Sequence, residues 1–335
     1  MSIQSMFVEN FTVFESLEMN FSDGINVFIG ENGVGKTHLL KLLYAFCENE
    51  VESSFVKKLN SCMLSSNTID SKDSSRFNRT LISLAPVLND KGSSVLHIKV
   101  AAPPNKYLDV AYEGSPDNSY GKEKTPSAFI PAKEMLSHSG IEKDYITRKL
   151  PLDDTLIDIL NKCGVSELRE LSETEQKMID AITRIIGGKV EYNNNKYYIN
   201  RDGGKVGFST ESEGFKKFAC IYRLIETGNL RSGSVLFWDE PEANINPKNI
   251  PALVKILFEL QSNGVQVFLA THNYFVAKYL NLLKPGEDKI VFHALYKYGG
   301  TVTSESNSDF EMLDNNLIVE QSIRLYEEEV EKALQ

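Results

Sequence analysis

One short stretch near the amino terminus constrains the fold of this chain more than any other. Residues 30–37 read Gly-Glu-Asn-Gly-Val-Gly-Lys-Thr and fit the pattern G-x-x-x-x-G-K-[ST]. The apolar residues 25–29 before it are typical of a buried strand, and apolar residues recur at helical spacing over 39–46. A strand, a glycine-rich loop and a helix in this order predict a phosphate-binding site at a helix N-terminus. A glycine-rich turn without a ligand is the weaker alternative in this context.

Each residue type in this loop has a chemical reason. Glycines allow backbone N–H groups to turn inward around phosphate oxygens, which a Cβ atom would obstruct. The Lys36 ammonium can reach the β- and γ-phosphates, and the Thr37 hydroxyl can ligate Mg²⁺. The predicted nucleotide-binding residues of the loop are Gly30, Asn32, Gly33, Gly35, Lys36 and Thr37.

A second feature is a pair of acidic residues after an apolar run. Residues 235–238 are Val-Leu-Phe-Trp, typical of a strand buried on both faces, and Asp239 and Glu240 follow directly. Ligands of parallel sheets lie outside the carboxyl ends of the strands, where such a pair can hold a metal ion and polarise a water molecule. Taken alone, the pair fits a solvated acidic turn equally well. The phosphate-binding loop predicted at 30–37 favours the metal-binding alternative over the solvated turn.

Three further residues lie where predicted elements begin or end. Ser212 and Gly214 lie where a helix with apolar spacing begins, so they are either an ordinary N-cap or part of an anion-binding helix terminus. His272 follows the apolar run 265–270. A single histidine is usually structural, but this one is expected at the sheet edge that carries the loop and the acidic pair, so a γ-phosphate contact is favoured.

Composition limits the class of protein. The 335 residues suffice for one large or two ordinary domains. The chain has 36 Lys and Arg residues and 46 Asp and Glu residues, a net charge of −10. This charge argues against a surface that is basic throughout. Binding of nucleic acid in a local basic groove stays possible. Four widely spaced cysteines predict reduced thiols and a cytoplasmic protein. No apolar run approaches the ~20 residues of a membrane span, so no membrane association is expected.

These motifs together resemble one superfamily, the ABC-type ATPases, in the branch of SMC, RecF and the OLD-like ATP-binding proteins. The resemblance is carried by GENGVGKT (30–37), a degenerate signature ESEGF (211–215), LFWDEPEANINP (236–247) and LATHN (269–273). Residues 129–137 resemble the stand-alone OLD-like group, which is often found in phage-defence and toxin–antitoxin systems. The resemblance implies an α/β P-loop NTPase fold with a mixed or parallel sheet core, an N-terminal antiparallel β-subdomain and an inserted helical lobe.

The expected organisation is a single ATPase domain spanning 1–335. Its parts are a nucleotide-binding core (1–47, 95–135 and 231–300), a polar insertion or arm (48–94, loop-like over 60–75), a helical lobe with the signature (136–230) and a C-terminal helix (301–335, helical over 315–334). Hairpins are expected over 95–112 and 189–200.

The resemblance also implies roles for the residues of one protomer. Lys36 and the loop amides would cradle the phosphates of ATP. Thr37 and Asp239 would hold Mg²⁺. Glu240 would act as general base or orient the attacking water, and His272 would sense the γ-phosphate. Such catalysis depends on positioning and electrostatics more than on covalent chemistry.

The same resemblance implies a partner. Ser212 and Gly214 would face the γ-phosphate of a second protomer, and residues 242–246 would form the D-loop. Two ATP molecules would then be enclosed in a head-to-tail homodimer.

Two departures from the common pattern predict slow or partner-gated turnover. The signature has Glu211, Glu213 and Phe215 where Leu, Gly and Gln are usual. A carboxylate beside a γ-phosphate is repulsive, so Glu213 must point away or weaken the closed dimer. The usual Q-loop glutamine is missing, since no Gln lies between Gln4 and Gln176, and Glu134 is the candidate substitute.

Several biological roles stay open. The favoured one is an ATP-driven switch that controls a separate effector, a nuclease or toxin, in anti-phage defence. About 60 residues follow His272, too few for a Toprim nuclease domain at ordinary domain sizes, so the effector is expected in trans. The alternative is a DNA-repair or DNA-clamping ATPase of the SMC/RecF kind, although no long heptad run predicts coiled-coil arms. A transporter subunit is disfavoured by the degenerate signature, and binding of ATP without hydrolysis by the intact Asp239, Glu240 and His272.

Overall fold

The computed structural model describes residues 2–48, 52–63, 80–86, 96–101, 109–113, 125–286 and 289–334. The α-helices of this part of the chain are α1 (Lys36–Cys47), α2 (Glu52–Met63), α3 (Ile141–Arg148), α4 (Asp154–Cys163), α5 (Glu173–Ile186), α6 (Glu213–Glu226), α7 (Ile250–Ser262), α8 (Tyr274–Leu283) and α9 (Leu317–Ala333). The strands are β1 (Ile3–Phe11), β2 (Phe14–Asn20), β3 (Ile25–Gly30), β4 (Thr80–Pro86), β5 (Leu96–Ala101), β6 (Asp109–Glu113), β7 (Ser127–Ile130), β8 (Lys189–Asn193), β9 (Lys196–Arg201), β10 (Gly204–Gly207), β11 (Val235–Asp239), β12 (Gln266–Ala270), β13 (Ile290–Tyr298) and β14 (Thr301–Asn307).

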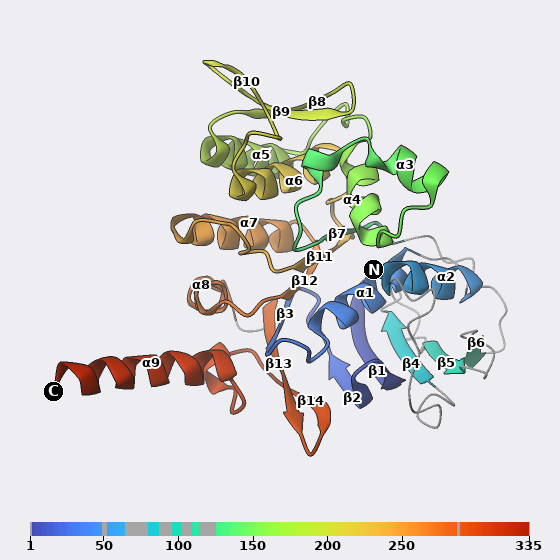
Figure 1. Cartoon of the computed structure of the whole chain (residues 1–335), viewed down its shortest axis with the longest axis vertical. Helices are drawn as coiled ribbons and strands as arrows, with labels where there is room; N and C mark the ends of the chain where they lie inside the picture. The colour runs from blue at the N-terminus through green and yellow to red at the C-terminus, as the bar shows by residue number, and fades with distance from the viewer. Residues whose placement is uncertain are drawn as a thin grey trace.

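A six-stranded mixed sheet forms the centre of the molecule (Figure 1). Its order is β14-β13-β3-β12-β11-β7, and all neighbours are parallel except β13 and β14. The register aligns Asp239 at the end of β11 with Ala270 of β12, and Ala270 with Phe28 of β3. Three parallel strands that each precede a predicted site residue therefore end at one edge of the sheet.

Both faces of this sheet are buried, which explains the continuous apolar runs of its strands. Ile25, Val27 and Ile29 of β3 face the core formed with α5–α8. Phe28 faces the opposite core, which contains α1 and the strands β1 and β2. The predicted α/β architecture, with a mixed sheet core and an N-terminal antiparallel sheet, is confirmed.

The N-terminal sheet has five antiparallel strands in the order β2-β1-β4-β5-β6. The predicted hairpin over 95–112 is confirmed for its strands, because β5 pairs antiparallel with β6, while its turn lies outside the described residues. These two strands extend the N-terminal sheet and not the central one, in contrast to the grouping of 95–135 with the core. The insertion 48–94 contains α2 and β4, so 60–63 are helical and not loop-like as predicted; residues 64–75 lie outside the described part.

The inserted lobe combines helices α3–α6 with a small antiparallel sheet, β10-β9-β8. Ser172 begins α5 with a capping box, in which Glu175 bonds back to the Ser172 backbone. The predicted hairpin over 189–200 forms around Asn194 and Asn195, both with positive φ as a tight hairpin turn requires.

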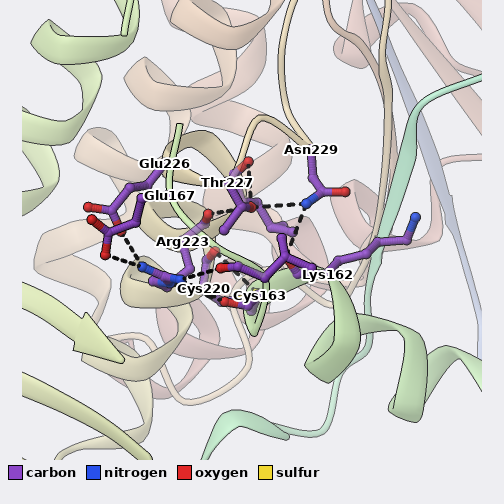
Figure 2. A network of polar contacts seen from close by, with 10 residues as sticks. Lys162, Cys163, Glu167, Cys220, Arg223, Glu226, Thr227 and Asn229 are labelled. Carbon is purple, nitrogen blue, oxygen red and sulfur yellow. Dashed lines mark hydrogen bonds and ion pairs between the residues drawn. The ribbon is translucent and has the colours of Figure 1, made fainter. Parts of the chain in front are cut away.

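A buried arginine joins two helices of this lobe (Figure 2). Arg223 of α6 donates to the carbonyl oxygens of Cys163, the last residue of α4, and of Val165, two residues further on, at 3.0–3.1 Å. Its guanidinium also pairs with Glu226 at 2.5 Å and Glu167 at 3.0 Å. Because the Arg223 side chain is only 1% exposed, these bonds are shielded from water and fix α6 against the end of α4.

The carboxyl-terminal part differs most from expectation. Residues 301–307, grouped with the C-terminal helix, form β14 against β13 instead. The helix α8 was not predicted, because residues 274–283 are apolar on several sides and show no single stripe. The predicted terminal helix is confirmed as α9, with Asn316 as its N-cap. Among the described residues, no helix has the length and apolar character that a membrane span needs.

Candidate nucleotide-binding site

The predicted site residues of one protomer meet at the carboxyl ends of β3, β12 and β11. The loop 30–37 follows β3, His272 lies two residues after β12, and Asp239 and Glu240 end β11. Ligands of parallel sheets bind at this edge. Lys36 and Asp239 therefore lie on the same side of the molecule, close enough for the carboxylate to affect the pKa of the lysine.

The glycines of the loop have packing reasons as well as conformational ones. Gly30 has φ of 142°, and a Cβ atom there would lie 2.2 Å from the Leu295 carbonyl oxygen. Gly35 has φ of 89°, and a Cβ atom there would lie 2.5 Å from the Phe14 ring. Gly33 has φ of 83° and open space beside it. Only Gly33 thus fits the prediction that a Cβ atom would intrude on the ligand side.

Lys36 lies at the base of the loop, at the start of α1. Its ammonium donates to the carbonyl oxygens of Gly30 at 2.7 Å and Glu31 at 2.8 Å. Burial lowers the pKa of Lys36, and the carboxylates of Asp239 and Glu240 oppose this shift. Residues 31–33 at the crest of the loop, including Asn32, are exposed. A largely buried cation beneath exposed amides at a helix N-terminus is suited to a polyanion.

Thr37 and Asp239 form a pair of oxygen donors. The Thr37 hydroxyl donates to Asp239 Oδ2 at 2.9 Å. Burial raises the pKa of Asp239, and the Thr37 hydrogen bond opposes that shift. A buried carboxylate beside a hydroxyl fits Mg²⁺, which takes oxygen ligands and needs few from the protein when phosphates supply the others. Among the described residues no group of three or more His, Cys, Asp and Glu is arranged to hold a metal ion, so any metal here depends on that phosphate contribution.

Glu240 and His272 face each other across the strand ends. His272 Nδ1 lies 3.3 Å from Glu240 Oε1. Glu240 is also a non-glycine residue with φ of +46°, a left-handed backbone that L-residues adopt at an energetic cost. Backbone strain at a carboxylate on a sheet edge is typical of a functional position.

The residues after Glu240 form a compact turn, residues 240–245, which we call the β11 turn. Glu242 accepts a hydrogen bond from Thr271 at 2.7 Å, and its second carboxylate oxygen is buried with no hydrogen-bond partner among the described residues. Burial raises the pKa of Glu242. The Thr271 contact was not predicted, although both residues end or follow neighbouring parallel strands.

Lys217 of α6 is the main residue that the sequence analysis missed. Its ammonium donates to the Glu240 carbonyl oxygen at 2.8 Å, and the residue is 2% exposed. A signal was available: Lys217 lies three residues after Gly214, on the same helix face.

Ser212 and Gly214 lie at the start of α6, as predicted. Ser212 occupies the N-cap position, but its side chain makes no capping hydrogen bond, so the plain N-cap alternative does not describe it. Ser212 is exposed. A Cβ atom on Gly214 would lie 2.9 Å from the Asn244 carbonyl oxygen, so this glycine allows α6 to approach the β11 turn. Both residues are expected to act on the nucleotide of a second protomer, and this stays a prediction.

The acidic residues of the signature segment have basic partners. Glu211 pairs with Arg201 at 2.7 Å, and Glu213 pairs with Lys216 at 2.7 Å. The charge of Glu213 is therefore partly balanced within the chain. Glu134 accepts from the Ser137 backbone at 3.1 Å and lies 4.0 Å from Lys216. Glu134 thus faces α6, and among the described residues no hydrogen bond joins it to Thr37 or Asp239.

Two family models match the chain. A model described as "AAA domain, putative AbiEii toxin, Type IV TA system" matches residues 112–277, and one described as "AAA ATPase domain" matches residues 1–83. Both describe AAA-family ATPase domains, which at the family level suggest ATP hydrolysis and nucleotide binding.

Curated relatives match over a short stretch. The DNA replication and repair protein RecF of Clostridium botulinum (strain Eklund 17B / Type B) is 43% identical over 44 residues, which cover 13% of this chain and 12% of that protein. RecF of Cytophaga hutchinsonii is 47% identical over 47 residues, 14% of this chain and 12% of that protein. The chain thus matches about an eighth of the length of these relatives.

Solved structures match over nearly the whole chain. The SMC head domain from Thermotoga maritima aligns with a TM-score of 0.55 and 14% identity, covering 91% of this chain and 98% of that one. An SmcHead bound to the C-winged helix domain of ScpA aligns with a TM-score of 0.59 and 11% identity, covering 91% and 97%. The fold is therefore an SMC head-like α/β P-loop ATPase fold. Together with the family models, this fold supports an ATPase.

Proposed function

We propose that this protein binds and hydrolyses ATP with Mg²⁺ and that ATP binding joins two copies head to tail. The observation that carries the proposal is the convergence of Lys36, the Thr37–Asp239 pair and the Glu240–His272 pair at one sheet edge. The P-loop amides and Lys36 hold the triphosphate. When Mg²⁺ is bound, it neutralises developing charge on the phosphates.

Hydrolysis requires a group that positions water. Glu240 can position this water because it is half-buried beside His272 and directly follows Asp239, the proposed metal ligand. His272 is exposed on the same edge and can contact a γ-phosphate as the sensor. Ser212, exposed and without a capping bond, is available for the nucleotide of the second copy.

The biological role proposed first is a switch that controls a separate effector, a nuclease or toxin, in anti-phage defence. The match of residues 112–277 to a model described as a putative AbiEii toxin of a Type IV TA system supports this reading. The SmcHead that is bound to a winged-helix domain of ScpA supports a distinct partner protein.

A second candidate is a DNA-maintenance ATPase of the SMC/RecF kind. It is supported by the RecF matches and by the SMC head-like fold, and it fits these comparisons at least as well. Measuring turnover with and without DNA separates the two roles, since only the second predicts a direct response to DNA.

The central experiment compares the purified protein with Lys36→Ala and Glu240→Gln. Binding of a fluorescent ATP analogue is expected in the wild type and in Glu240→Gln but not in Lys36→Ala. Phosphate release is expected only in the wild type, and a Glu240→Gln dimer is expected to accumulate with ATP in light scattering. Unchanged affinity in Lys36→Ala would refute the P-loop role, and wild-type hydrolysis by Glu240→Gln would remove Glu240 from the mechanism.

A further inference from the structure

The β11 turn contains two residues in a left-handed backbone conformation. Glu240 has φ of +46° and Asn244 has φ of +63°. Asn adopts this region readily, but Glu does so at a cost, since its Cβ crowds the backbone. Within the turn, the Ala243 N–H donates to the Glu240 carbonyl at 3.0 Å. Such a conformation persists only where its surroundings hold it.

Helix α6 contacts the turn at both of these residues. The Lys217 ammonium donates to the Glu240 carbonyl oxygen at 2.8 Å. Gly214, three residues earlier on the same helix face, lies so close to Asn244 that a Cβ atom would approach its carbonyl oxygen to 2.9 Å. The first turns of α6 therefore rest on the β11 turn at its two left-handed positions.

Lys217 is an unusual residue for a purely structural contact. It is 2% exposed, and among the described residues no carboxylate forms an ion pair with it. Burying a cation that has no ion-pair partner costs free energy. A Met or Leu side chain would pack here without that cost but could not donate a hydrogen bond to Glu240.

We infer that Lys217 is a positioning residue that holds the backbone of Glu240, and through it the Glu240 carboxylate, in the geometry required for hydrolysis. The inference rests on the proposed function. It adds to that function a link within one chain, from the end of α6 that carries Ser212 and Gly214 to the residue that orients water. An arrangement of this kind would make turnover depend on the position of α6.

Lys217→Met tests this directly, with the double variant Glu213→Gln/Lys216→Met as the matched control, which removes a buried cation of α6 without leaving the Glu213 carboxylate unbalanced. Lys216 is also buried on α6, but it pairs with Glu213 and Glu134 and not with the β11 turn. Because a misplacement of about 1 Å at a reacting group can cost about 100-fold in rate, kcat of Lys217→Met is expected to fall by roughly that factor. Its affinity for the ATP analogue should stay within about threefold of wild type, since the P-loop is untouched.

Two further readouts separate positioning from packing and from charge. Lys217→Arg keeps a donor and a charge and should retain turnover within about tenfold of wild type. The melting temperature of Lys217→Met should be equal to or above that of wild type. If Lys217→Met fails to fold, Lys217→Gln, which is neutral and too short to reach the carbonyl, takes its place with the same expected loss.

The pH profile supplies a test that a structural role would not affect. Burial lowers the pKa of Lys217 to about 8, against the opposing effect of three carboxylates. The charge is present below that pH and lost above it, so wild-type turnover should decline above about pH 8 while Lys217→Arg does not. The titratable and charged groups around Lys217 are Asp239, Glu240, Glu242, Cys220, Lys133, Glu134 and Lys216.

The outcomes are distinct. Wild-type turnover together with undiminished turnover in Lys217→Met would overturn this inference and leave the proposed function standing. An equal loss in Glu213→Gln/Lys216→Met would also overturn it, because the effect would then belong to the packing of α6. Absence of hydrolysis in the wild type would refute the proposed function and this inference with it.

Discussion

Replacing Arg223 with methionine is expected to destabilise the inserted lobe strongly. Methionine keeps the apolar stem of the side chain but removes every donor. In the wild type, the guanidinium donates hydrogen bonds to the carbonyl oxygens of Cys163 and Val165. It also forms ion pairs with the carboxylates of Glu167 and Glu226 (Figure 2). All of these contacts are lost at once, in a place where only 1% of the arginine side chain is exposed.

The magnitude follows from what is left behind. Glu226 is 15% exposed, and removing one member of a buried ion pair costs about 3–5 kcal/mol because the other charge stays uncompensated. Glu167 is 57% exposed, so its loss of a partner adds only about 0–1 kcal/mol. We therefore expect the free energy of unfolding to fall by roughly 3–5 kcal/mol. Glu167→Gln is the matched control and should change it by less than about 1 kcal/mol.

The destabilisation should depend on pH in a defined direction. Burial raises the pKa of Glu226, and the Arg223 guanidinium opposes that shift. Without the guanidinium the pKa rises further, so the folded state binds a proton more readily than the unfolded chain. The cost is then fully present when Glu226 is charged, above its folded pKa, and diminishes as pH falls. The difference between Arg223→Met and wild type should thus be smaller at pH 5 than at pH 8.

Urea unfolding followed by the fluorescence of Trp238 measures this effect. Trp238 is the single tryptophan of the chain and is fully buried. A lower midpoint with an unchanged slope is the expected result, since the slope reflects the surface exposed on unfolding. A loss under about 1 kcal/mol, or a loss as large in Glu167→Gln, would refute the assignment of a buried, charge-paired Arg223.

Three further substitutions address the site. Ser212→Arg lies at an exposed position without a capping bond, so it should preserve folding and ATP binding yet prevent ATP-dependent dimerisation; a doubled mass in light scattering with ATP would contradict this. Asp239→Asn should weaken the Mg²⁺-dependent part of ATP binding by about tenfold or more, measured by titration with and without Mg²⁺. Gly30→Ala should lower the free energy of unfolding by about 2–4 kcal/mol, because its Cβ would lie 2.2 Å from the Leu295 carbonyl and its φ is 142°. A thermal melt unchanged from wild type would exclude that clash.

The sequence predicted the core of the site because its signals are local. The loop 30–37 and the strand ending at Asp239 each carry a motif whose neighbours fix its secondary structure. The rule that parallel strands present ligands at their carboxyl ends then brings these segments together without knowledge of the strand order. His272 was located by the same rule.

Contacts between distant segments escaped prediction. Lys217 meets Glu240 only because α6 crosses the end of β11, and the interval of 23 residues between them carries no periodic signal of that crossing. Thr271 and Glu242 meet because β11 and β12 are neighbours, which the sequence does not specify. The glycines were predicted for a ligand, whereas Gly30 and Gly35 are also required by packing behind the loop.

Secondary structure was missed where pattern and packing disagree. The strand β14 is rich in Ser and Thr, and it forms because it pairs with β13 at seven positions. Its residues are mostly half-buried, so alternation is weak. The helix α8 buries only Val276, Ala277 and Leu280, whereas Phe275 and Leu282 are apolar but exposed. These exposed apolar residues hide the buried stripe of period 3.6 in the sequence.

Helix α6 is held at both of its ends, and this limits how the site can respond to a second protomer. Near its start, Gly214 and Lys217 contact the β11 turn. Near its end, Arg223 fixes it to the residues after α4. These two contacts, which we call anchors, add to the packing of the buried residues 216–225 along the helix.

The two anchors differ in the number of bonds that hold them. The Arg223 anchor joins α6 to a neighbour in the same lobe through several buried bonds, so α4 and α6 are expected to move together. The Lys217 anchor is a single hydrogen bond to a residue in a strained conformation, and it lies on the central sheet side. Under the proposed function, rotation of the lobe against the sheet is therefore expected to act on Glu240 through the contact between α6 and the β11 turn.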